Sequence, residues 1–396
     1  MPHLYQMVGF LGVTFLMLGS AHYYLYRQVA GRLGLAGRRR VGAGLVFAVL
    51  LLASVAMLPL NRALPRALAS PLAWVVFTWI GSLLILVMVF AVTDILRLVL
   101  RPVLRVQGWN PARRALFGRV LGLGSLGVAG GLIGFSLWQG LRKVAVRPQP
   151  VTLAKLPPAL DGLRIVQLTD LHIGSTINGE WLRGVVAQVN ALDPDIVAIT
   201  GDLVDGSVAE LAPHVAPLAA LRARHGVFFV TGNHEYFSGA PAWIAHISAL
   251  GIRVLLNERV TLYPRGDQQG IDIAGVDDYA GLRFPGHGPD FGLALNGRDA
   301  SRPLILLAHQ PLAIREAAAR GVDLQLSGHT HGGQIWPWRY LVGLEQPYVA
   351  GLHQHPGSTT QIYVSCGTGY WGPPMRLGTE AEITTITLHA AGGGVA

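Results

Sequence analysis

Four apolar stretches fill the first 140 residues of this 396-residue chain, and they constrain its fold more than any other feature. They run over residues 4–24, 41–60, 71–92 and 116–137. Each is long enough to cross a hydrocarbon layer about 30 Å thick as a helix that rises about 1.5 Å per residue. No acidic residue interrupts them, and Asp94 lies just beyond the end of the third. The sequence therefore predicts a four-helix transmembrane anchor over residues 1–145.

The charge of the chain changes near the same boundary. Residues 1–150 hold 16 of the 31 Lys and Arg residues but only one of the 22 acids. A nucleic-acid-binding protein would carry its basic patch on the folded domain, so we expect no nucleic-acid partner. Arginines gather between the first and second stretches and between the third and fourth, which indicates cytoplasmic loops there. We expect a multi-pass inner-membrane protein whose C-terminal domain lies on the periplasmic or extracellular side.

Two smaller features bear on export and on redox chemistry. Arg113 and Arg114 precede the fourth stretch and resemble a twin-arginine export signal. They equally fit the positively charged flank of an ordinary span, and both interpretations place the C-terminal domain on the same side. Cys366 is the single cysteine, so an internal disulfide and a thiolate metal cage are excluded.

Prolines at 148, 150, 157 and 158 mark a linker over 146–160, followed by a globular domain over 161–390. Short runs rich in β-branched residues predict strands there at 163–168, 195–200, 227–231, 253–256, 271–274, 304–308, 324–326, 361–364 and 383–388. Amphipathic patterns predict helices at 181–192, 211–224 and 242–250. Strands that alternate with helices indicate an α/β domain.

Five polar blocks each follow one of the predicted strands. They are Asp170-Leu171-His172, Gly201-Asp202-Leu203-Val204-Asp205, Gly232-Asn233-His234-Glu235, His309, and Gly328-His329-Thr330-His331. Ligands of open α/β sheets bind beyond the carboxyl ends of the strands, so these blocks are expected to meet. One block alone would fit a turn or a helix cap. Together they supply carboxylate, imidazole and amide groups, a donor set that suits Mn, Fe or Zn. Two such ions need a bridging carboxylate, and Asp202 fits that role.

In this order the blocks resemble the signature of the calcineurin-like metallophosphoesterase superfamily. The Gly-His-Thr-His-Gly-Gly-Gln form at 328–334 and the membrane-anchored first part are similar to its bacterial membrane or exported YkuE/YaeI-like branch. The resemblance implies a four-layer αββα sandwich of two sheets flanked by helices. It also implies two divalent metal ions. Their implied ligands are Asp170, His172, Asp202 and His331 for one ion, and Asp202, Asn233, His309 and His329 for the other.

The activity that the resemblance implies is hydrolysis of a phosphodiester or pyrophosphate, by a hydroxide that bridges the two metals. A lipid or cell-envelope substrate is expected because the domain would lie beside a bilayer. His234 has the place of the family's catalytic histidine and would stabilise phosphoryl oxygens or protonate the leaving alkoxide. Asp205 is expected to orient a loop or a ligand histidine. A phosphomonoesterase with the same site and a membrane-tethered metal-binding module without turnover remain as alternatives.

Asp278 and Arg376 are further candidates for substrate binding. Asp278 follows the 271–274 strand and either lines the cleft or forms a turn. Arg376 matches an arginine often seen after the Gly367-Thr368-Gly369 turn in this branch, and either contacts phosphate or buttresses the loop. The aromatic segment 332–340 would meet a lipid or sugar phosphate, or pack as an ordinary loop.

Overall fold

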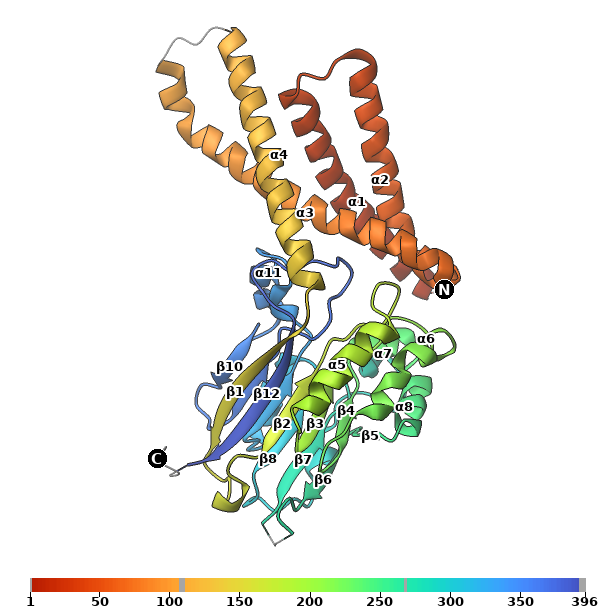
Figure 1. Ribbon diagram of the computed structural model, residues 1–396, viewed down its shortest axis with the longest axis vertical. Coiled ribbons are helices and arrows are strands. Elements are labelled where there is room, and N and C mark those ends of the chain that lie inside the picture. Colours follow the sequence, from red (N-terminus) through yellow and green to blue (C-terminus); the bar gives the residue numbers. More distant parts are fainter. Residues whose placement is uncertain (1, 107–110, 267–268, 392–396) are drawn as a thin grey trace. The chain divides into compact units, whose positions relative to one another are not determined.

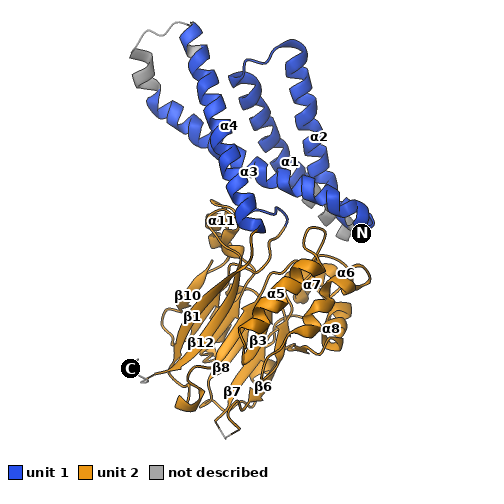
Figure 2. Ribbon diagram, viewed as in Figure 1, with its two compact units in different colours: residues 1–141, 372–375 blue, residues 142–371, 376–396 orange. Residues whose placement is uncertain are grey.

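The structure, a computed structural model, describes residues 2–106, 111–266 and 269–391. It divides into two compact units (Figure 2). The helical unit comprises residues 1–141 with 372–375, and the second unit comprises residues 142–371 with 376–396.

Four long helices form the first unit: α1 (Pro2–Arg32), α2 (Gly37–Ala63), α3 (Arg66–Val106) and α4 (Pro111–Leu141). Each predicted span lies within one of them. Three helices are long and apolar enough to cross a membrane, over Gly37–Met57, Arg66–Leu100 and Ala115–Leu141. The described part of α1 does not qualify, and most side chains of its first eleven residues lie outside that part. The expected four spans are therefore corrected to three among the described residues.

Polar side chains tie the helices of this unit together. Asp94 on α3 forms an ion pair with Arg32 on α1 and accepts a hydrogen bond from the Tyr24 hydroxyl at 2.9 Å. Trp79 on α3 donates to His22 on α1 at 2.9 Å. Between apolar helices in a bilayer, hydrophobic contacts alone do not favour one packing arrangement over another. Hydrogen bonds and ion pairs such as these favour a particular arrangement.

Two six-stranded sheets form the second unit (Figure 1). The strands of the first sheet, in spatial order, are β1 (Ala145–Leu153), β12 (Glu382–Ala390), β2 (Arg164–Leu168), β3 (Ile196–Thr200), β4 (Val227–Val230) and β5 (Arg253–Val254). Those of the second sheet are β10 (Gly351–Gln354), β11 (Gln361–Val364), β9 (Leu324–Ser327), β8 (Leu304–Leu307), β7 (Ile271–Gly275) and β6 (Glu258–Leu262). Strands β2 to β5 are parallel, and so are β7, β8, β9 and β11.

The two sheets pack face to face, with helices on both outer faces. Ile165 and Phe228 of the first sheet share one buried cluster with Ile273 and Leu307 of the second. Helices α5 (Gly179–Ala191), α6 (Val208–Val215) and α8 (Ala240–Ala249) cover the first sheet, and α9 (Phe291–Leu295) and α10 (Ile314–Ala319) cover the second. The four-layer αββα sandwich is therefore confirmed. The remaining helices are α7 (Asn233–Ser238), α11 (Arg339–Glu345) and the 3-10 turns η1 (Pro158–Leu160), η2 (Ala216–Ala220), η3 (Tyr279–Arg283), η4 (Pro311–Ala313) and η5 (His331–Gly333).

All nine predicted strands are present, within one or two residues at most ends, but three strands were not predicted. They are β1, β6 and β10, each of which lies at an edge of its sheet; β5, the fourth edge strand, was predicted at 253–256. An edge strand pairs on one side only and carries a weaker apolar pattern than a central strand. β1 occupies much of the expected linker, and its Pro148 and Pro150 are tolerated because an edge strand needs fewer N–H donors.

Candidate metal centre

The predicted metal ligands all lie just beyond the carboxyl ends of central strands. Asp170 and His172 follow β2, and Asp202 follows β3. Asn233 is the first residue of α7 after β4, His309 follows β8, and His329 and His331 follow β9. Because these strands run parallel within each sheet, their ends meet at one edge of the sandwich.

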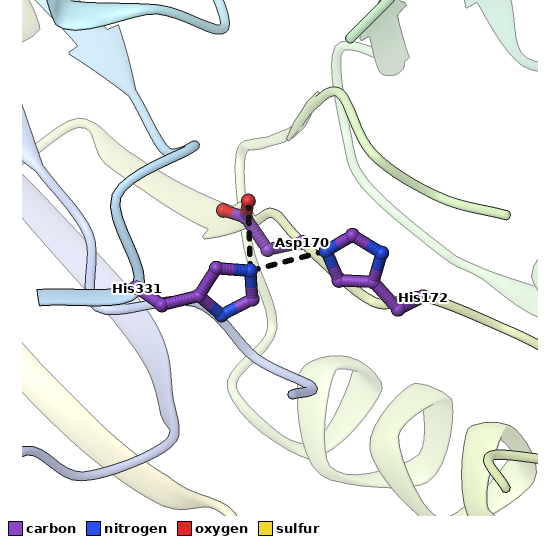
Figure 3. A group of neighbouring side chains, drawn as sticks. All are labelled: Asp170, His172 and His331. Atoms are coloured by element: carbon purple, nitrogen blue, oxygen red, sulfur yellow. Dashed lines mark hydrogen bonds and ion pairs between the residues drawn. The ribbon is translucent and has the colours of Figure 1, made fainter. Parts of the chain in front are cut away.

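The first cluster consists of Asp170, His172 and His331, whose side chains point toward one another (Figure 3). His331 Nε2 lies 3.5 Å from Asp170 Oδ1 and 3.1 Å from His172 Nε2. All three side chains are buried. Asp170 is held in place by the backbone N–H of His329, which donates to its carboxylate at 2.9 Å.

The second cluster consists of Asp202, His309 and His329, joined by Asn233. His309 Nε2 lies 3.1 Å from Asp202 Oδ2 and 3.2 Å from Asn233 Oδ1. His329 Nδ1 lies 2.9 Å from Asn233 Oδ1 and 3.3 Å from His309 Nε2. Four donor atoms from four separate segments thus lie around one point.

Hydrogen bonding shows that this point suits a cation. His309 Nδ1 lies 2.8 Å from the carbonyl oxygen of Thr200, which only accepts, so Nδ1 carries the proton. The other ring nitrogen of His309 then turns toward the oxygens of Asp202 and Asn233, both acceptors. Ligands about 2.1 Å from one ion are separated from each other by about 3.0–3.4 Å in octahedral or tetrahedral geometry. The observed separations of 2.9–3.3 Å match such an ion.

Asp202 lies between the two clusters. Its Oδ2 atom is 3.1 Å from His309 Nε2 in the second cluster and 3.9 Å from His172 Nε2 in the first. Its Oδ1 atom accepts from the backbone N–H of His234 at 2.8 Å, which fixes the carboxylate plane. A single carboxylate is therefore within reach of both ligand sets.

The charges of the buried groups also favour bound cations. Burial would lower the pKa of His309, but the Asp202 carboxylate raises it well above its ordinary value. Burial and the charge on His309 lower the pKa of His329 to about 3, so this imidazole presents a neutral ring. Burial, helped by His172, lowers the pKa of His331 well below its ordinary value. A divalent ion held by these residues would balance the charge of the buried Asp202 carboxylate.

Asp205 connects the first cluster to His234. Its Oδ1 atom lies 3.2 Å from His172 Nδ1 and 2.5 Å from His234 Nδ1. Burial opposes ionisation of Asp205, but the imidazoles of His172 and His234 lower its pKa. Burial would also lower the pKa of His234, whereas Asp202 and Asp205 raise it to about 9. His234 Nε2 lies 3.9 Å from Asp202 Oδ2, so this ring faces the cluster with its other nitrogen.

Unusual backbone geometry places the ligands. Asp170, His172, Asp202, His329 and His331 have φ between 48° and 70°, in the left-handed region that is rare for residues other than glycine. Gly328 allows Asp170 to approach the strand end, because a Cβ there would lie 2.2 Å from Asp170 Oδ2. Strained backbone of this kind clusters at functional sites.

The two substrate-binding candidates differ in position. Asp278 is buried beyond β7, where both carboxylate oxygens accept from Gln310 Nε2 at 3.1 Å, and burial raises its pKa to about 6. Gln310 is adjacent to His309 in the chain. Asp278 therefore contacts the neighbour of a predicted ligand of the second cluster. Arg376 is fully buried and donates to the carbonyls of Gly367 and Gly369. Its guanidinium therefore stabilises the loop that contains Gly367 and Gly369.

Three residues near the centre have no role that was predicted from the sequence. Glu235 accepts from the backbone N–H groups of Asp202 and Leu203 at 3.0 and 2.7 Å, and so shapes the loop after β3. Its position directly after His234, in one of the polar blocks that follow a strand, was an available signal. Phe237 and Trp371 lie with ring centroids 5.4 and 5.6 Å from that of His234, and no local pattern marked them.

Comparisons with known proteins identify the family. The family model described as calcineurin-like phosphoesterase matches residues 163–333. An uncharacterized metallophosphoesterase of Helicobacter pylori strain J99 is 40% identical over 279 residues, which cover 70% of this chain and 73% of the relative. The uncharacterized metallophosphoesterase YkuE of Bacillus subtilis strain 168 is 32% identical over 284 residues, covering 70% and 96%.

A transmembrane protein with metallophosphoesterase domain from Bos taurus is 45% identical over 256 residues, covering 62% of this chain and 57% of that protein. The chain thus spans little more than half the length of this relative. The chain belongs to the calcineurin-like metallophosphoesterase family, whose members are phosphoester hydrolases that use metal ions.

Proposed function

We propose that this chain hydrolyses a phosphodiester or pyrophosphate bond with two divalent cations, of Mn, Fe or Zn. One would be held by Asp170, His172, Asp202 and His331, and the other by Asp202, Asn233, His309 and His329. The observation that carries the proposal is the position of Asp202 Oδ2, 3.1 Å from a nitrogen of one set and 3.9 Å from a nitrogen of the other. When bound, such a cation pair neutralises the phosphoryl group and lowers the pKa of the attacking water.

The residues of the chain have distinct roles in this proposal. Asp202 and Asp170 supply the negative charge that retains the cations, and the neutral rings of His329 and His331 supply lone pairs. His234 is protonated at neutral pH, because its pKa is raised to about 9, and can therefore donate a proton to the leaving oxygen. Asp205 positions His234 through Nδ1, which leaves Nε2 toward the substrate.

The first unit suggests where the substrate is found. Three helices long and apolar enough to cross a membrane support a membrane protein, with residues 1–145 as anchor and 161–390 as catalytic domain. A lipid or another cell-envelope phosphoester would reach a catalytic domain held at a bilayer. We further propose the inner membrane, with the catalytic domain on the periplasmic or extracellular side. A reporter fused after Ala396 that is active only in the cytoplasm would refute this orientation.

Substitution of the shared carboxylate tests the two-metal proposal. The full-length protein, purified in detergent and loaded with Mn²⁺, is assayed on bis-p-nitrophenyl phosphate and on p-nitrophenyl phosphate. We expect turnover of the diester, and Asp202→Ala should abolish it and reduce the bound metal. Asp193→Ala is the matched control, because that carboxylate is 72% exposed and pairs only with surface Arg224 in the described structure.

The same assay separates the alternatives. Turnover of the monoester alone would indicate a phosphomonoesterase with the same site. Bound metal without turnover of either ester would indicate a metal-binding module. Full activity in Asp202→Ala would refute the two-metal site.

A further inference from the structure

Two exposed aromatic side chains flank His234. Phe237 on α7 is 48% exposed, and Trp371, in the loop after β11, is 56% exposed. Both meet the imidazole edge-on, at interplanar angles of 66° and 74°. Two exposed aromatic rings in contact with the same imidazole form an apolar surface that a ligand bound at this imidazole would cover.

Both aromatic residues are fixed by segments that also carry predicted metal ligands. Trp371 is clamped through its backbone, because its N–H donates to Gln334 Oε1 at 3.0 Å and its carbonyl accepts from Gln334 Nε2 at 3.0 Å. Gln334 follows η5, which begins at His331. Phe237 lies on the short helix that begins at Asn233. The positions of both residues are therefore tied to the segments that carry the predicted metal ligands.

We propose that Phe237 and Trp371 form an aromatic clamp for the organic group on the leaving oxygen of the phosphoester. This inference rests on the proposed function and on the position of His234, whose Nε2 atom faces the metal cluster, 3.9 Å from Asp202 Oδ2. The first atoms beyond the oxygen then lie beside the His234 ring, where the two aromatic rings are found. The clamp selects substrates whose leaving alcohol is apolar or aromatic, and disfavours small polar alcohols, which gain little from contact with the rings.

The chemical step balances without a further reactant. The oxygen of water bonds to phosphorus, the bond from phosphorus to the leaving oxygen breaks, and its electron pair stays on that oxygen. His234 donates one proton to give the free alcohol and is reprotonated by the proton that water released. The clamp takes part in none of these transfers. It acts by holding the alcohol portion beside His234 Nε2.

An internal competition tests the clamp. Methyl benzyl phosphate carries one small and one aromatic ester group, and hydrolysis releases either methanol or benzyl alcohol. The full-length protein loaded with Mn²⁺ should release benzyl alcohol in large excess. Trp371→Ala and Phe237→Ala should each reduce the ratio of benzyl alcohol to methanol about tenfold. Trp371→Phe should retain most of the preference.

Tyr263→Ala is the control, because Tyr263 is a 46% exposed aromatic residue that follows β6, at the opposite end of the second sheet. A product ratio that is the same in the wild type and in both alanine variants would overturn the clamp. If no ester is hydrolysed, the proposed function fails, and binding decides the clamp separately. Calorimetry on the Mn²⁺-loaded protein should show tighter binding of benzylphosphonate than of methylphosphonate, and Trp371→Ala should remove that difference. Equal affinities in the wild type would refute it.

Discussion

Asp205→Asn removes the negative charge that lies between His234 and the predicted metal ligand His172. In the wild type, Asp205 Oδ1 lies 2.5 Å from His234 Nδ1 and 3.2 Å from His172 Nδ1. Asparagine keeps the size of the side chain but removes the charge. The substitution should therefore leave the fold intact and change the protonation of His234.

The magnitude follows from the charges around His234. Burial would lower its pKa below the ordinary 6.5, and the Asp202 and Asp205 carboxylates raise it to about 9. A group with a raised pKa stays protonated until the pH passes that value, so a rate that needs protonated His234 is lost as pH rises toward 9. Bound cations offset part of the Asp202 contribution, which moves this loss to a somewhat lower pH. A nearby opposite charge shifts a pKa by about 1–3 units. Asp205→Asn should therefore move the alkaline limb down by about that amount.

The assay is the pH dependence of kcat/KM for bis-p-nitrophenyl phosphate at saturating Mn²⁺, with metal content measured on each sample. We also expect a loss of activity at neutral pH of about 10- to 100-fold, because His172 loses the partner that orients it. Asp193→Asn, at an exposed carboxylate, is the control and should match the wild type. An alkaline limb at the same pH in Asp205→Asn and in the wild type would show that this carboxylate does not set the pKa of His234.

Three further predictions concern the frame of the site. Gly328→Ala would place a methyl group 2.2 Å from Asp170 Oδ2, so it should lower both the metal content and the activity by about tenfold or more. Gly184→Ala is its control, because nothing lies within 4 Å of the added Cβ, and it should keep both. Arg376→Met removes a fully buried guanidinium from the loop carbonyls that it binds, and should lower the free energy of unfolding, measured with a denaturant, by about 2–4 kcal/mol. Arg320→Met, at an exposed arginine, should lower it much less. Chelation of the metal should lower the melting temperature. Mn²⁺ at about 100 times its Kd should restore about 2.7 kcal/mol of folding stability. A melting temperature unaffected by either treatment would contradict metal binding to the folded chain.

The central strands could be predicted from the sequence because each is buried on both faces. The run at 196–200, for example, consists of residues that are all buried in β3. The edge strands β1, β6 and β10 could not, because their side chains are largely half-buried or exposed and their pattern resembles that of a loop. Pro148 and Pro150 even indicated a linker, since the sequence does not show which strands will lie at an edge.

The meeting of the polar blocks at one edge of the sandwich could be predicted from the sequence, whereas the detailed contacts around the candidate site could not. The polar blocks can be recognised in the sequence because each follows a predicted buried strand. Parallel strands end at one edge of a sheet, so the blocks are expected to lie together. The contact of Thr200 with His309 joins two residues that lie 109 positions apart in the chain. The approach of Trp371 to His234 likewise joins distant parts of the chain. Local patterns contain no information about such contacts, so the direction in which a buried side chain points has to come from the fold.

The left-handed backbone at five predicted ligands connects metal binding to folding. Each of Asp170, His172, Asp202, His329 and His331 has a φ that costs about 1–2 kcal/mol for a residue with a Cβ. Their carboxylates and imidazoles are also buried beside one another, which is unfavourable without a cation. The side chains of Asp170, His172 and His331 point toward one another (Figure 3), and those of Asp202 and His329 gather with His309 in the second cluster. Cation binding offsets both at once, so the edge of the sandwich that carries the ligands should be the part of the domain whose stability depends most on metal.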